Sequence, residues 1–177
     1  MSSFSSEEYA RGVVRTVQII VAALAMGLII FAGIVMSLRL NQPAQPLQDK
    51  ILQYFAIGFA VVMLAARRVI GSSTVARHRR NIAAGKGLVL GRGGVPLPAA
   101  TDGDRLLFVF QQKTIIESAM VEGPAFFTVV VYLITGEAWL LGIAAVLLAV
   151  LIVPFPTFDR VAEWVKYQLE LIELEKR

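Results

Sequence analysis

The chain has 177 residues, contains no cysteine and carries a formal net charge of +4 at pH 7. Hydrophobic residues make up 56% of it and charged residues 17%, against about 45–50% and 25% in an average soluble domain. The lack of cysteine excludes disulfides, thiolate catalysis and cysteine-ligated metals, and the length suits a single domain over residues 1–177.

The first long apolar run covers residues 19–38, twenty residues without a charge. A helix rises about 1.5 Å per residue, so about twenty apolar residues cross the ~30 Å hydrocarbon core of a bilayer. The run is too long for a signal-peptide core of about 7–15 residues. It predicts a retained span over about 17–38, entered from a polar lead whose serines and acids favour a helix start.

Pro43 and Pro46 follow, and each lacks an N–H donor, so residues 41–46 are expected to form a hairpin connection. The next apolar run, residues 51–66, predicts a second span over about 48–68. Beyond it, residues 69–84 allow the helix to continue as a basic helix.

The largest polar element is the cytoplasmic connection 69–113. Its middle is crowded with glycine and proline between Gly85 and Pro98, which predicts a loop or a tight hairpin. Thr101 and Asp104 are typical of a helix start, so a helix is preferred for the second half. Pairing of strands at 88–90 and 106–110 is the competing interpretation.

Two further apolar runs, 118–136 and 138–158, predict spans over about 115–136 and 138–156. Pro154 and Pro156 should end or kink the last of these helices. Apolar residues then recur every three or four positions, so the tail 157–177, which Thr157 can cap, is expected to be an amphipathic helix. It would lie at the headgroup level or pack against the basic connection of the same or a neighbouring subunit.

Basic residues set the orientation of this all-α, four-span membrane protein. Of the seventeen lysines and arginines, only Arg39 and Lys50 fall on the side of the first connection. Because lysine and arginine resist translocation, the side with fifteen should be cytoplasmic. We therefore expect both termini in the cytoplasm and a bacterial inner-membrane location.

Glu122 is the acid most in need of explanation, because it lies within an apolar run. Acidic residues within membrane spans usually face the protein interior and often have a functional role. Thr114, Ser118 and Glu122 recur every four residues and share one helix face. One interpretation is a protonatable carboxylate in a proton or cation path. The favoured one is an interhelical ion pair that sets packing, with Arg15, Arg67 and Arg68 as candidate partners.

Other motifs are weaker. In the glycine-rich stretch, Gly87 follows Lys86 where a phosphate-binding loop needs serine or threonine. Arg77, Arg79 and Arg80 lie about ten residues beyond a span, which favours contact with anionic lipid headgroups over nucleic acid. A lone histidine is a poor metal site. No catalytic motif is visible, so we expect neither an enzyme nor a cofactor or metal.

Small residues recur at the four-residue spacing by which membrane helices pack closely. The pairs are Ala23 and Gly27, Ala56 and Ala60, and Ala145 and Ala149. They predict a compact bundle and leave a homo-oligomer or a larger membrane complex open.

The segments 110–127 and 155–164 resemble a small uncharacterised family of four-span bacterial membrane proteins. That resemblance implies no activity. The small residues around Glu122 are also similar, locally, to the second helix of rotary ATPase c-subunits, which implies Glu122 alone as an ion-binding acid. We expect a structural, accessory or interaction component of the membrane, with an ion-conducting module as the alternative.

Overall fold

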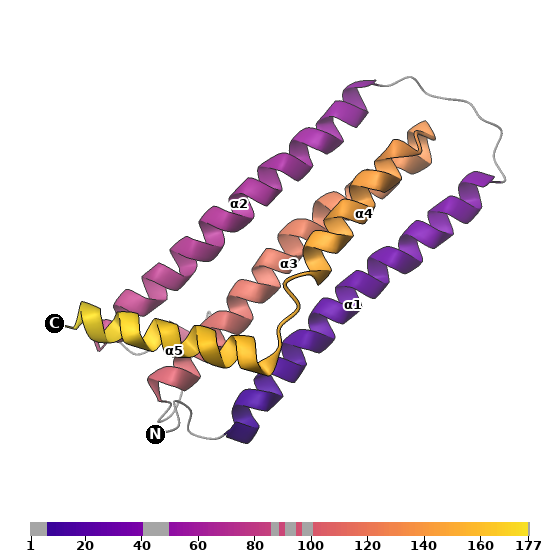
Figure 1. Ribbon diagram of the computed structural model, residues 1–177. Helices are drawn as coiled ribbons and strands as arrows, with labels where there is room; N and C mark the ends of the chain where they lie inside the picture. Colours follow the sequence, from indigo (N-terminus) through magenta and orange to yellow (C-terminus); the bar gives the residue numbers. More distant parts are fainter. Residues whose placement is uncertain (1–6, 41–49, 86–88, 91–94, 97–100, 177) are drawn as a thin grey trace. The chain divides into compact units, whose positions relative to one another are not determined.

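The computed structural model of the protein describes residues 7–40, 50–85, 89–90, 95–96 and 101–176. Within these residues the chain forms five helices and one pair of short strands (Figure 1). In chain order the elements are α1 (Glu7–Leu40), α2 (Lys50–Ala83), β1 (Val89–Leu90), β2 (Val95–Pro96), α3 (Asp102–Thr135), α4 (Trp139–Ile152) and α5 (Phe158–Glu175). The expected helical fold is confirmed.

Three of the helices are longer than a bilayer is thick. α1, α2 and α3 have 34 residues each, which is about 51 Å at the helical rise, against ~30 Å for the hydrocarbon core. All three are long and apolar enough to cross a membrane. Each helix also extends beyond its apolar stretch at one end. α1 begins at Glu7, before its apolar stretch, and α3 begins at Asp102, before its own; α2 continues to Ala83, after its apolar stretch.

The predicted start of α3 is confirmed in detail. The Thr101 hydroxyl donates to Asp104 Oδ2 at 2.8 Å, and the Asp104 backbone N–H donates back to Thr101 Oγ1 at 3.2 Å. This reciprocal capping satisfies donors that the first helical turn leaves unpaired. Asp104 is buried (3% exposed), so the cap is part of the packed structure.

The strand pair corrects one alternative for the connection. β1 and β2 are antiparallel, with Val89 opposite Pro96 and Leu90 opposite Val95. Residues 106–110 lie inside α3, so their pairing with 88–90 was the wrong interpretation, and the helix preferred there is correct. The rest of the glycine-rich turn and the 41–46 connection lie outside the described residues.

α4 is shorter than the other apolar helices. It has 14 residues, about 21 Å at the helical rise, where the sequence predicts a span over 138–156; by itself it is shorter than the three helices that can cross a membrane. The Val153 N–H still donates to the Ala149 carbonyl at 2.8 Å. Pro154 and Pro156 have no N–H to continue the ladder, so the helix ends before them, as predicted.

The chain divides into two compact units, to which α1, α2 and α3 each contribute. The first, which we call the charged unit, comprises Met1–Gln18, Ile70–Ile115 and Pro156–Arg177. The second, which we call the apolar unit, comprises Ile19–Val69 and Ile116–Phe155.

α5 packs into the core of the charged unit. Its buried residues are Val161, Val165, Gln168 and Ile172, at the four- and three-residue steps of one helix face. The three apolar ones join a cluster with residues of α1, α2 and α3. The other members of that cluster are Ala10, Val14, Val75, Ile82, Leu106, Leu107 and Val109. Of the two interpretations of the tail, packing against the connection of the same chain is therefore observed.

Polar contacts accompany this packing. Arg79 Nη2 lies 2.7 Å from Glu175 Oε1, and Lys176 Nζ lies 3.3 Å from Asp102 Oδ2. Before α5, the Gln18 side-chain amide donates to the Pro156 carbonyl at 2.7 Å. The Thr157 side chain makes no capping hydrogen bond at the N-cap position of α5, so only its backbone has the predicted role.

α3 is the central helix of the apolar unit. In its most apolar 18-residue stretch 44% of residues are buried, against 22% in α1 and 17% in α2. One face of α3 packs against the other three helices. The buried cluster comprises Ala25, Leu28 and Val35 of α1, Ala60 of α2, Val121, Ala125 and Val129 of α3, and Ala144, Leu147 and Leu151 of α4.

The predicted small-residue contacts are confirmed for one pair. Ala56 and Ala60 are 1% and 5% exposed and belong to buried clusters. Ala23, Ala145 and Ala149 are exposed instead, so the apolar unit does not use them as internal contacts.

A tight turn joins α3 to α4. Gly136 has a φ of 75°, which favours glycine, and its N–H donates to the Tyr132 carbonyl at 2.8 Å. A Cβ at this position would clash with the guanidinium of Arg39, which lies against the turn. Arg39 thus places a positive charge at the C-terminal end of α3, where the helix dipole favours it.

Candidate functional site

A cavity lies within the apolar unit, where α2, α3 and α4 meet. It has a volume of about 910 Å³. Most of its lining is aliphatic, and three charged side chains also line it: Arg67, Arg68 and Glu117. The aliphatic lining residues are Leu64, Ala65, Val146, Ala149, Val150, Val153 and Pro154. We call this cavity the arginine pocket.

A second cavity continues along α2 and α4. Its volume is about 340 Å³, and it shares Leu64 and Val146 with the arginine pocket. Its remaining lining is uncharged and reaches Trp139 at the start of α4. The two cavities are therefore neighbours along α2 and α4, and we call them together the α2–α4 groove. Its charged residues are all in the arginine pocket.

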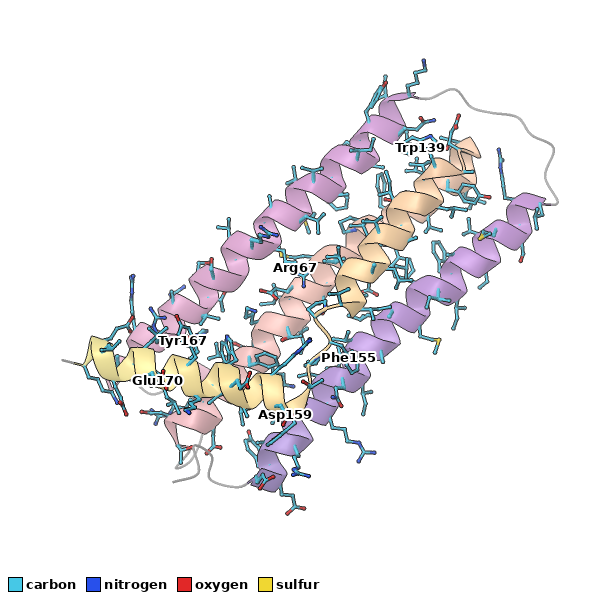
Figure 2. All side chains as sticks on the ribbon, viewed as in Figure 1. Arg67, Trp139, Phe155, Asp159, Tyr167 and Glu170 are labelled. Carbon is cyan, nitrogen blue, oxygen red and sulfur yellow. The ribbon has the colours of Figure 1, made fainter. Side chains whose placement is uncertain are left out.

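Local chemistry explains the position of Arg67, which is labelled in Figure 2. The Val150 carbonyl would normally accept a hydrogen bond from residue 154, but proline has no N–H. The Arg67 Nη1 donates to this carbonyl at 3.4 Å. An unpaired carbonyl in apolar surroundings is costly, so the proline creates an acceptor that the arginine satisfies.

Thr114, Ser118 and Glu122, the predicted polar stripe on α3, differ in their surroundings. The Thr114 hydroxyl donates to the Phe110 carbonyl at 2.9 Å, a local bond within the same helix. Ser118 is buried (5% exposed), while Glu122 is half-buried. Two of the three residues thus have an ordinary packing role.

No ion pair of Glu122 occurs among the contacts of the described residues. Its pairing with Arg15, Arg67 or Arg68 stays a prediction. Arg67 and Arg68 do have an acid near them, since Glu117 lines the same pocket. The sequence places that acid near the membrane surface and leaves it without a role.

The basic cluster of the charged unit is divided between two environments. Arg79 is held by Glu175 of α5, with a 2.8 Å hydrogen bond from its Nε. Arg77 and Arg80 are exposed, so these two remain accessible to an anionic partner. Within the described part of the chain no three acids or histidines gather as metal ligands would.

Two features of the site were not recognised in the sequence. The arginine pocket was not predicted, although the sequence held a signal for it. Pro154 leaves the Val150 carbonyl without its helical hydrogen-bond donor, and Arg67 and Arg68 follow the apolar run 51–66. Gln168 was missed as well. It is 6% exposed, and its Oε1 has no hydrogen-bond partner among the described residues. Nothing in the amphipathic pattern marks that position as buried.

Comparison with protein-family models, with curated proteins and with solved structures finds no match to this chain. The resemblance to a family of four-span bacterial proteins therefore stays a prediction.

Proposed function

We propose that the protein is a four-span membrane protein of the bacterial inner membrane with an accessory or interaction role. The observation that carries the proposal is the apolar surface that the fold leaves uncovered. On α1, Ile19 and Ile30 are 61% and 56% exposed, and on α2, Val61 and Val62 are 59% and 62% exposed. Large apolar side chains exposed in such number along two helices favour lipid or a partner over water as their surroundings.

The division into units supports the proposed spans. The unit boundaries lie at 18/19, 69/70, 115/116 and 155/156, within two residues of the span ends expected from the sequence. α4 is the shortest proposed span at about 21 Å. Trp139 at its start, labelled in Figure 2, is 43% exposed and suits a headgroup region. Phe155 extends the apolar stretch after its end.

The proposed topology places both termini and the 69–113 connection in the cytoplasm. Because the chain has no cysteine, single-cysteine variants report location without background. Glu137→Cys, in the α3–α4 turn, should react in intact cells with a thiol reagent that does not cross membranes. Glu173→Cys, on the exposed side of α5, should react only after permeabilisation. Equal labelling of both sites in intact cells would refute the topology.

An interaction role is supported by the outer face of α5. Asp159, Tyr167 and Glu170, labelled in Figure 2, are exposed on it, while the opposite face is packed in the charged unit. A partner that binds this face should co-purify in mild detergent and be lost from the Glu170→Lys variant. Glu137→Lys is the matched control, with the same charge reversal in the α3–α4 turn. Co-purification that is indifferent to both changes would argue against α5 as the interaction surface.

Proton or cation conduction through Glu122 is the second candidate. It is supported by the position of this carboxylate, half-buried in the apolar unit with no ion pair among the described contacts. Vesicles containing the protein and a pH-sensitive dye test it, with Glu137→Gln as the control. A flux abolished only by Glu122→Gln supports conduction. Absence of flux, with the Glu122 variant merely less stable in detergent, supports the packing role.

A further inference from the structure

The α2–α4 groove has the length of a lipid acyl chain. It extends along α4 from Trp139 to Pro154, fifteen residues or about 22 Å at the helical rise. One leaflet of the hydrocarbon core is about 15 Å deep, half of ~30 Å. The groove is therefore long enough to hold a chain from the membrane surface to the bilayer centre.

Charge is confined to one end of this groove. Arg67 and Arg68 come directly after the apolar run 51–66, and Pro154 marks the end of the apolar helix opposite them. Under the proposed topology this is the cytoplasmic headgroup level. Two guanidinium groups and the Glu117 carboxylate give the lining a net charge of +1. A single negative charge at this level would neutralise it.

Guanidinium groups suit a phosphodiester in particular. Arg67 is oriented by its hydrogen bond to the Val150 carbonyl, and a guanidinium has five N–H donors, so donors remain for a second acceptor. Arg68 follows it in the chain and is exposed. The planar fork of arginine matches phosphate oxygens in pairs. A purely apolar occupant, such as a helix of a second copy, would leave these cations uncompensated.

We propose that the α2–α4 groove binds one monoanionic phospholipid of the phosphatidylglycerol type. Its phosphate lies at Arg67 and Arg68, and one acyl chain lies along Ala149 and Val146 toward the bilayer centre. The proposal rests on the proposed membrane location. It assigns the lipid contact to residues other than the Arg77, Arg79 and Arg80 cluster.

The charge requirement is tested by titrating the purified full-length protein with phosphatidylglycerol, phosphatidylethanolamine and inorganic phosphate, and counting bound molecules by native mass spectrometry. One saturable phosphatidylglycerol site is expected, with weaker binding of the zwitterionic lipid and none of free phosphate. Arg68→Gln should weaken binding about fivefold, the effect of one basic residue at a membrane surface. Arg160→Gln removes the same charge from the exposed side of α5 and should change nothing.

The shape requirement is tested without changing charge. Ala149 lines the groove, whereas Ala145, one turn earlier on α4, is exposed and does not. Ala149→Phe should obstruct the path of the acyl chain beside the arginine pocket and weaken phosphatidylglycerol binding, while Ala145→Phe should bind normally. Equal binding of the two lipids, or full binding by both Ala149→Phe and Arg68→Gln, would overturn the proposal. Loss of the lipid site leaves the protein in the membrane fraction, whereas failure of the proposed location would show as solubility without detergent.

Discussion

The docking of α5 in the charged unit provides the most direct quantitative test of the fold. Val161, Val165 and Ile172 are each at most 1% exposed, and full burial of such side chains contributes about 1.5–3 kcal/mol apiece. The ion pairs of Glu175 and Lys176 are partly exposed, and pairs of this kind contribute about 0–1 kcal/mol each. Apolar packing should therefore hold the helix in place.

Val165→Ala puts a number on this expectation. The change removes two methyl groups at about 0.8 kcal/mol each and leaves a small cavity. The free energy of undocking should fall by about 2 kcal/mol, which is about a thirtyfold rise in the open population at 1.36 kcal/mol per tenfold. Hydrogen exchange of the α5 amides, followed by mass spectrometry in detergent, reports this population.

Two controls separate packing from charge and from helix propensity. Leu174 is 63% exposed, so Leu174→Ala should leave α5 exchange nearly unchanged. At about 0.5 kcal/mol per pair, the middle of that range, the double variant Glu175→Gln and Lys176→Gln should raise exchange about fivefold beyond the last turn. If the charge variant opened α5 as far as Val165→Ala does, or if Val165→Ala had no effect, the reasoning from buried area would be refuted.

Three further changes test individual structural details by thermal unfolding in detergent. Gly136→Ala should destabilise the protein by about 1 kcal/mol or more, because φ is 75° there. As a control, Gly142→Ala lies in open space within α4 and should leave the stability unchanged or raise it. The same loss of stability at both sites would show that the α3–α4 turn does not require glycine. Thr101→Val removes the cap of α3 and should cost about 1 kcal/mol, an expectation that unchanged stability would refute. Leu107→Ala empties a fully buried position and should cost about 2–5 kcal/mol, so a loss below about 1 kcal/mol would show that the charged unit is not packed there.

Local signals predicted the helices well. The end of α4 follows from Pro154, and the start of α3 follows from Thr101 and Asp104. Each depends on a neighbour within four residues, so the backbone chemistry of the sequence alone decides it. Apolar run length predicted four spans; three helices are long and apolar enough to cross a membrane, and α4 is a shorter apolar helix.

Contacts between distant residues were predicted less well. Arg67 and Val150 are 83 positions apart, and Gly136 and Arg39 belong to different helices. Of the three small-residue pairs, all with the same spacing, only Ala56 and Ala60 are buried. Spacing says which residues share a face but not what that face meets.

The sequence by itself determined that the chain is helical, where α3 begins, that α4 ends near its prolines, and which stretches are apolar enough for a membrane. Only the tertiary structure decided that α5 docks on its own chain and that an arginine of α2 and the proline that follows α4 line the same end of one groove. The physical reason is the separation along the chain between the residues that interact. Helix formation depends on hydrogen bonds over four residues, whereas packing depends on how whole side-chain surfaces fit together.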